Sequence, residues 1–328
     1  MKRQLYTKQE VIKFISEGKK MVLSASENML DQLPKGSWIG GTSPYFMDTD
    51  VGKFTEEKIF VDDLTDVATD FKIETFDKDS IKNIAVNSFK NGFTVLIIPG
   101  DSDTHFEFGI NSLTYDKIFN NPIVGFIAGF DLSKLGEASP KVYNGQKNEK
   151  ITNNGVAIHI KLPDNKVARA EILNLDTIDR TSPKIKFPTT SFIQSECTIN
   201  GEKSNIADYL SEIKYKEGLP IIADYNGALI NRDIKVIDKK KKEVAFFSPV
   251  FHDETYYLAN VIDNYHELFG EKLKTDNLNI PYSCICVSYY LLGNLENKKI
   301  QAEGVFAFGE IAFQLLNQTL VFLEIDEV

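Results

Sequence analysis

The apolar positions of this chain switch repeatedly between helical and strand spacing. In residues 8–18, Val11, Ile12, Phe14 and Ile15 recur at helical spacing, which predicts an amphipathic helix. Similar spacing predicts further helices at 27–33, 77–90, 102–111, 205–213 and 265–273. Apolar and β-branched runs predict strands at 21–24, 38–42, 58–64, 67–76, 93–98, 123–130, 156–162, 167–175, 191–199, 228–237, 244–251 and 319–325. The expected fold class is α+β, with mixed β-sheets flanked by helices.

A polar, turn-rich segment near the middle of the chain predicts a domain boundary. Residues 136–155 contain Pro140 and the turn pairs Asn144-Gly145 and Asn154-Gly155. A chain of 328 residues is long for one small domain. We therefore expect two domains, an α/β domain over 1–140 and an α+β domain over 141–328, and we find no repeat of fixed period.

The charge balance narrows the classes of partner. Lys and Arg number 37 against 47 Asp and Glu, which leaves a net charge of −10. An acidic chain is poorly suited to nucleic acid or to an anionic membrane surface. The basic tract 239–242 lies between two predicted strands and is expected to form a hairpin loop.

The apolar runs and the cysteines predict the cellular compartment. No apolar run approaches the roughly eighteen residues of a membrane span, and the start of the chain lacks the apolar core of a signal peptide. Three cysteines, Cys197, Cys284 and Cys286, are too few for a disulfide framework. We expect a cytoplasmic protein with reduced thiols and no membrane insertion.

Polar side chains interrupt the apolar carboxy-terminal segment. Glu310 and Asn317 precede the predicted strand at 319–325, where burial of a carboxylate or an amide must be offset by hydrogen bonds. The two side chains could hold a small polar ligand in one cavity. Alternatively, they satisfy backbone groups at a bend.

Several short motifs resemble the FIST sensory domain, the "F-box and intracellular signal transduction" domain of bacterial signalling proteins. The motifs follow one another in the order 38–42, 122–126, 218–221, 282–286, 309–311 and 317–319. They correspond to the family's Gly-Gly-Ser/Thr segment, a second glycine-containing strand, a Gly-Leu-Pro turn, a Ser-Cys pair and the closing Gly-Glu-Ile and Asn-Gln-Thr elements. The Gly-Arg that the family places after its Ser-Cys pair is Ile285-Cys286 here.

The resemblance implies a two-domain, stand-alone bacterial sensor. Such a module reversibly binds a small molecule without turnover, and its signal would pass to a separate partner protein, because no kinase or cyclase is recognised in the chain. Some FIST-like proteins contain haem, so a haem-containing gas sensor is one alternative. Its axial ligand would come from His105, His159, His252 or His266.

Other candidate site residues come from strand ends and turns. Gly40, Gly41 and Thr42 lie where a strand runs into a loop, so they either approach a ligand or form a tight turn, and the neighbouring Trp38 belongs either to the site or to the core. The turn after the strand at 93–98 carries candidates that are either helix caps or ligand contacts, namely Asp101, Ser102 and His105.

A Ser- or Cys-dependent hydrolase is the remaining alternative. Ser102 and His105 share a helix face, but the Gly-x-Ser-x-Gly elbow is missing. Cys284 and Cys286 are either buried and inert or a thiol site, and no zinc-like spacing surrounds them. We expect the candidate segments around residues 38–42, 101–105, 284–286 and 310–317 to converge on one ligand pocket between the two halves of the chain.

Overall fold

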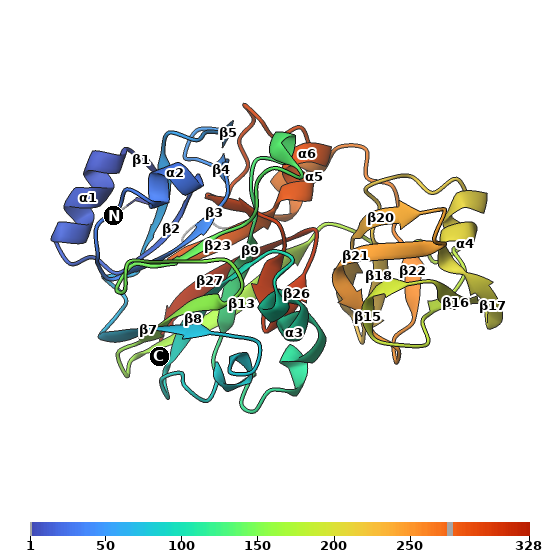
Figure 1. The fold of residues 1–328 in the computed structure, drawn as a ribbon, viewed down its shortest axis with the longest axis horizontal. Helices are drawn as coiled ribbons and strands as arrows, with labels where there is room; N and C mark the ends of the chain where they lie inside the picture. The colour runs from blue at the N-terminus through green and yellow to red at the C-terminus, as the bar shows by residue number, and fades with distance from the viewer. Residues whose placement is uncertain (1, 274–277) are drawn as a thin grey trace.

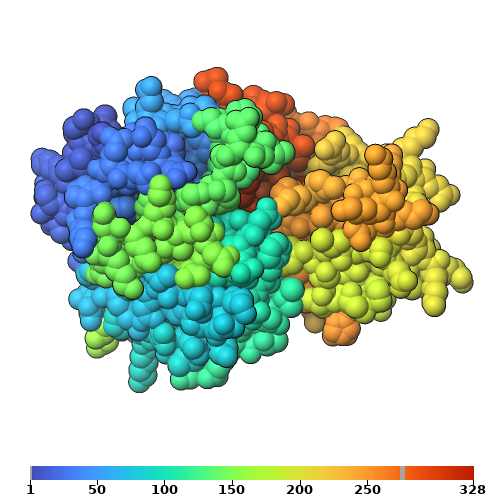
Figure 2. Space-filling model, in the orientation of Figure 1, coloured from blue at the N-terminus to red at the C-terminus, as the bar shows by residue number. Residues whose placement is uncertain are grey.

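The computed structural model describes residues 2–273 and 278–328. The fold is α+β, and it consists of a main body and a smaller lobe that lie side by side (Figures 1 and 2). None of the helices in the described segments is both long and apolar enough to cross a bilayer.

The main body contains three six-stranded sheets with one shared topology. Their strand orders are β1-β6-β2-β3-β10-β11, β7-β12-β8-β9-β25-β26 and β13-β27-β23-β24-β4-β5. In each sheet the third and fourth strands are parallel, and every other neighbouring pair is antiparallel. The body therefore repeats one topology three times, which the sequence analysis did not detect because the repeats have unequal lengths.

The first unit spans residues 4–63. Thr7 caps its first helix with a reciprocal Thr7–Glu10 capping box. Its elements are β1 (Gln4–Tyr6), α1 (Lys8–Ser16), β2 (Met21–Ala25), α2 (Glu27–Leu30), β3 (Trp38–Thr42), β4 (Tyr45–Met47), β5 (Gly52–Phe54) and β6 (Ile59–Asp63). The hairpin β4–β5 leaves this unit and joins β24 of the third sheet.

The second unit spans residues 70–161 and donates its own hairpin, β10–β11, to β3 of the first sheet. Its elements are β7 (Asp70–Phe76), η1 (Ile81–Asn83), β8 (Gly92–Pro99), α3 (Asp103–Asn111), η2 (Ser112–Thr114), β9 (Ile123–Ala128), η3 (Leu132–Lys134), β10 (Val142–Asn144), β11 (Glu149–Ile151) and β12 (Gly155–Lys161).

The third unit spans residues 166–327 and donates the hairpin β25–β26 to β9 of the second sheet. Its body elements are β13 (Lys166–Asn174), α5 (Tyr265–Lys272), β23 (Tyr282–Cys286), α6 (Val287–Leu292), β24 (Gly304–Ala307), β25 (Glu310–Ala312), β26 (Gln314–Leu316) and β27 (Thr319–Glu327).

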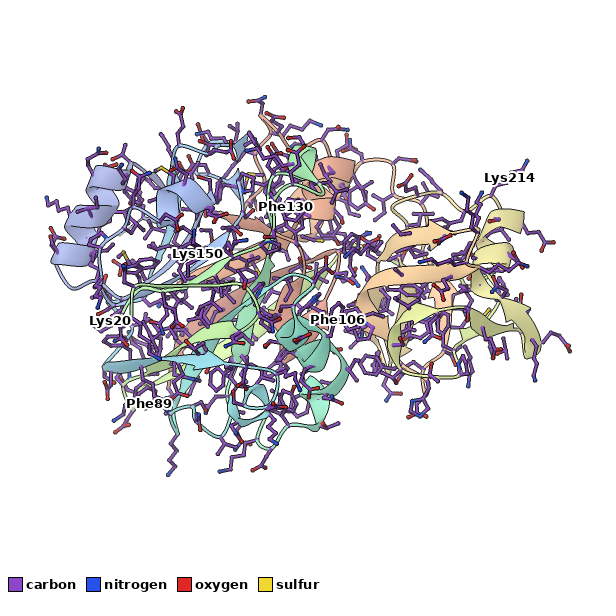
Figure 3. The ribbon with its side chains drawn as sticks, viewed as in Figure 1. Lys20, Phe89, Phe106, Phe130, Lys150 and Lys214 are labelled. Atoms are coloured by element: carbon purple, nitrogen blue, oxygen red, sulfur yellow. The ribbon has the colours of Figure 1, made fainter. Side chains whose placement is uncertain are left out.

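The lobe is an insertion into this third unit. A bridge between Ile178 and Ala259 marks its base, so we define the inserted lobe as residues 178–259. It contains β14 (Ile185–Lys186), β15 (Ser191–Gln194), β16 (Glu196–Ile199), β17 (Glu202–Asn205), α4 (Ile206–Glu212), β18 (Ile221–Tyr225), β19 (Ala228–Arg232), β20 (Ile234–Asp238), β21 (Glu243–Val250) and β22 (Tyr256–Leu258). The lobe has its own apolar core, and Lys214 marks its outer end in Figure 3.

The apolar cores follow the three-unit arrangement. One central core combines buried residues of all three sheets, including Ile39, Phe126 and Val321. Separate cores lie under α1 and α2, under α3, and under α5 and α6, so each sheet has its own helical cover (Figure 1). The two parallel strands at the centre of each sheet are thus buried on both faces.

Two expectations about the chain's organisation need revision. Sheets cross the boundary expected at residue 140, because β10 to β12 pair with β3, β7 and β8. The helix predicted at 77–90 is wrong, since that segment contains only the short η1 and turns. The Asp77 carboxylate accepts hydrogen bonds from the backbone amides of Asp79 and Ser80, and this local turn competes with helix formation.

The hairpin predicted around residues 239–242 is confirmed between β20 and β21.

Candidate functional site

A cleft of about 460 Å³ lies between the main body and the inserted lobe. The body side consists of the end of β23, the start of α6 and the residues that follow β24, including Cys286, Ser288 and Phe308. The lobe side includes Asp233 and Phe247. Because β23 and β24 are parallel, the cleft lies at the carboxyl ends of two parallel strands, the usual ligand position in such sheets.

Asp233 is the buried carboxylate of this cleft. It lies between β19 and β20 and is only 4% exposed. The Ser288 hydroxyl of α6 donates to its Oδ2 over 2.9 Å, which links the lobe to the body. Burial raises the pKa of Asp233 to about 6, although hydrogen bonds from Gln318 and Ser288 oppose the rise.

Asn317 lies in the turn between β26 and β27 and connects the main body to the inserted lobe. Its Oδ1 accepts the backbone amide of Asp233 over 3.3 Å and the hydroxyl of Ser248. Its Nδ2 donates to the Leu316 carbonyl over 2.9 Å. Asn317 therefore both lines the cleft and fixes the position of Asp233.

Arg232 fastens the lobe to the same turn region. Its guanidinium donates to the Leu315 carbonyl over 3.1 Å and to the Gln314 side chain over 3.2 Å, and it is almost fully buried. The neighbouring Asn231 donates to Asp176 over 3.0 Å and to the Gln318 carbonyl over 3.2 Å. Burial raises the pKa of Asp176 to about 7. These buried polar contacts hold the lobe against the body.

Glu310 and Cys286 form a buried acid–thiol neighbourhood behind the cleft. The Glu310 carboxylate accepts hydrogen bonds from the Thr319 hydroxyl over 2.8 Å and the Thr319 amide over 3.1 Å, while its Oε1 has no hydrogen-bond partner among the described residues. Burial raises the pKa of Glu310 to about 8. The pKa of the Cys286 thiol is also raised, mainly by burial and secondly by the charge of the neighbouring Glu310. At neutral pH the Glu310 carboxyl is therefore mostly protonated and the Cys286 thiol is uncharged.

Three of the predicted site residues belong to this region, namely Cys286, Glu310 and Asn317. Asp101 lies at its edge, because its carboxylate pairs with Lys235 of the lobe at 2.7 Å and Lys235 lines the cleft. The structure thus brings part of the predicted set together, although the partner surface is the inserted lobe rather than residues 1–140.

Trp38, Gly40 and Gly41 take core positions away from this cleft. Trp38 is 1% exposed and donates its indole N–H to the Pro34 carbonyl over 3.0 Å. A Cβ at Gly41 would lie 2.6 Å from Ile97 and 2.8 Å from Phe126. Gly40 and Gly41 therefore permit close packing of β3, Gly40 against Trp38 and Leu30 and Gly41 against the neighbouring sheet.

Thr42 lies in a different cleft, of about 500 Å³, at the carboxyl ends of the parallel strands β2 and β3. Its hydroxyl donates to the Gly129 carbonyl over 2.6 Å and accepts the Lys141 amide over 2.9 Å. The side chain thereby connects the first and second sheets. Phe130, labelled in Figure 3, also lines this cleft.

Ser102 and His105 serve the start of α3. The Ser102 hydroxyl accepts the His105 amide over 3.1 Å and donates to the Pro99 carbonyl over 2.7 Å, so Ser102 is the helix N-cap. The Asp101 amide donates to Nδ1 of His105. No hydrogen bond joins the side chains of Ser102 and His105 among the described contacts, and the predicted capping role is confirmed.

His105 and its neighbour Phe106 also contact the lobe. Both rings pack edge-on against Phe192 of β15, at centroid distances of 5.4 and 5.0 Å. Phe106 is labelled in Figure 3. Burial lowers the pKa of His105 to about 4. His105 is therefore a neutral packing residue of the interface.

Cys284 is fully buried, and its thiol donates to the Gly125 carbonyl over 3.1 Å. In the described segments, no three His, Cys, Asp or Glu side chains are arranged to hold a metal ion. None of the four histidines lines the interlobe cleft, and His252 lies in the lobe beside Thr190. A haem in this cleft would thus have no histidine ligand.

Sequence reasoning missed Asp233, Ser288 and Arg232. The triplet 231–233 lies inside the apolar run 228–237, which was predicted as one strand but forms two. Buried polar residues within a strand pattern were the signal that identified Glu310, and the same signal was present here.

Comparison with known proteins gives a family without an assigned activity. No curated protein and no solved structure matches the chain. One family model, described as a family of unknown function (DUF6976), matches residues 6–326. Because that match covers nearly the whole chain, the protein belongs to the DUF6976 family.

Proposed function

We propose that this protein reversibly binds a small molecule in the interlobe cleft and acts as a non-catalytic sensory module. The observation that carries the proposal is the 460 Å³ cleft at the carboxyl ends of β23 and β24, bounded by a lobe that has its own apolar core. Clefts of this size between lobes commonly hold small ligands. The resemblance of the short motifs to FIST sensory domains is a second, independent line of support.

The protonation states of the cleft favour binding over catalysis. A cysteine nucleophile needs a thiolate, yet burial and Glu310 raise the pKa of Cys286. Glu310 with a pKa of about 8 is mostly protonated at neutral pH and offers no ready base. The hydrolase alternative through Ser102 is disfavoured by its capping bonds to Pro99 and His105.

The inserted lobe offers a route from binding to signalling. A ligand that contacts both Asp233 of the lobe and Ser288 of the body would stabilise one relative position of the two. A separate cytoplasmic partner would then distinguish the two positions of the lobe.

The proposal is tested by native mass spectrometry of freshly purified protein, with an absorption spectrum of the same sample. We expect an additional small mass that is lost in Leu292→Trp, because Leu292 lines the cleft and is partly exposed. Ile172→Trp, on the exposed side of β13, is the matched control and should retain the mass.

Two outcomes would contradict the proposal. One is a bare wild-type mass together with no thermal stabilisation by a small-molecule cell extract. The other is a bound mass that Leu292→Trp leaves unchanged, which would place the ligand elsewhere. A Soret band would favour the haem alternative and direct attention to the histidines.

A further inference from the structure

The interlobe cleft combines apolar walls with one buried carboxylate. Ile234 and Phe247 of the lobe and Leu291, Leu292 and Phe308 of the body provide apolar surface. Asp233 supplies the buried charge, and it lies on the same wall as Ile234.

The hydrogen-bond partners of Asp233 are electrically neutral. Ser288 donates a hydroxyl to its Oδ2, and the Asp233 backbone amide donates to Asn317. Neutral donors solvate a carboxylate only in part, so an ionised Asp233 retains a desolvation cost.

The nearest basic residues along the chain are engaged elsewhere. The Arg232 guanidinium donates to Leu315 and Gln314, and the Lys235 ammonium pairs with Asp101 at 2.7 Å. Within the described segments, the ion pairs formed by arginine and lysine do not include Asp233. The carboxylate is therefore held in the cleft without a countercharge from these residues.

A bound cation would supply that countercharge. Ammonium groups donate up to three hydrogen bonds and pair with carboxylates, and the desolvated setting strengthens the pair. An organic anion would instead meet Asp233 and the nearby Glu217 at the cleft wall, and like charges in contact are costly. The rings of Phe247 and Phe308 favour an apolar or aromatic body next to the cation.

We propose that the cleft recognises a primary amine with an apolar body, whose ammonium group pairs with Asp233 and whose body packs on Phe247, Phe308 and Leu291. This inference rests on the proposed function, because it names the ligand class of the same cleft. The inferred determinant of specificity is Asp233, which lies in the lobe.

The test compares three probes of similar shape and different charge by titration calorimetry at about pH 7.5, where Asp233 with a pKa of about 6 is ionised. The probes are 2-phenylethylamine, 2-phenylethanol and 3-phenylpropanoate. We expect the amine to bind the wild-type protein at least about tenfold more tightly than the alcohol, and the carboxylate to bind most weakly.

Asp233→Asn should weaken binding of the amine by about 30-fold or more and leave binding of the alcohol unchanged, because it removes one partner of a buried charge pair. Asp164→Asn, in an exposed turn, is the matched control. If Asp233→Asn does not fold, the order of the three probes on the wild-type protein still decides the question.

Equal binding of amine and alcohol, or unchanged amine binding in Asp233→Asn, would overturn the amine assignment and leave the cleft as a site for another ligand. Absence of amine binding up to about 10 mM would overturn it as well. The proposed function is judged separately, by the native mass and the Leu292→Trp variant, so the two failures are distinguishable.

Discussion

Replacing Glu310 with glutamine should change how the stability of the protein depends on pH. Glu310 is fully buried, its Oε1 finds no hydrogen-bond partner in the described part of the chain, and burial raises its pKa from 4.5 to about 8. The folded state therefore holds a proton that the unfolded state releases above pH 4.5. The contribution of Glu310 to the free energy of unfolding is therefore fully present below pH 4.5 and is lost as the pH rises from 4.5 to about 8.

The magnitude follows from that difference in pKa. Each pKa unit corresponds to about 1.4 kcal/mol. Between pH 5 and pH 8, ionisation of Glu310 should lower the free energy of unfolding by roughly 3 kcal/mol in the wild-type protein. Asp233 and Asp176 also have raised pKa values, but they are present in both proteins and largely cancel in the comparison. Glutamine keeps an oxygen for the Thr319 donors and cannot ionise.

The assay is urea unfolding at several pH values between 5 and 8, followed by fluorescence of Trp38. Trp38 is the single tryptophan and is 1% exposed, so its emission reports on unfolding of the main body, which also contains Glu310. We expect a much flatter pH dependence in Glu310→Gln than in the wild-type protein. Glu137→Gln, at an exposed loop position, should keep the wild-type profile. Parallel profiles for the wild-type protein and Glu310→Gln would refute the reasoning.

Two glycine substitutions test the packing of the core, and thiol labelling tests the state of the cysteines. Gly41→Ala should lower the free energy of unfolding by about 1–3 kcal/mol, because its Cβ would lie 2.6 Å from Ile97 and 2.8 Å from Phe126. Gly270→Ala in α5, where no atom of the described residues outside the helix itself lies within 4 Å of the new Cβ, should instead stabilise the protein slightly because alanine is the better helix former. Equal effects of the two substitutions in chemical denaturation would contradict the packing account. Burial raises the pKa values of Cys284 and Cys286, and that of Cys197 to about 11, so Ellman's reagent should label none of the three in the native protein near pH 8 and all three after denaturation. Rapid native labelling of Cys286 would instead indicate a thiolate and favour the catalytic alternative.

The sequence predicted the local elements well where capping and periodicity agreed. The helix predicted at 8–18 is α1, with Thr7 as its cap, and the helix predicted at 102–111 is α3, with Ser102 as its cap. The helix predicted at 77–90 failed because the Asp77 side chain organises a turn that periodicity does not detect.

The sequence predicted only part of the candidate site. Glu310 and Asn317 were recognisable as polar residues in an apolar setting, and both prove to be buried and hydrogen-bonded. Gly40 and Gly41 were equally recognisable, but a glycine pattern alone does not distinguish close packing from ligand contact. The FIST resemblance, the ligand and the signalling role remain predictions.

By itself, the sequence determined the α+β class, the main helices and strands, and the buried polar residues near the carboxy terminus, because these depend on spacing and composition over a few neighbouring residues. Only the tertiary structure decided that each unit donates a hairpin to another sheet, and that Asp233 of the lobe meets Ser288 and Asn317 of the body. Those contacts join positions 55 and 84 residues apart. They depend on which sheet edges and surfaces are complementary, and patterns over a few neighbouring residues do not specify such long-range pairing.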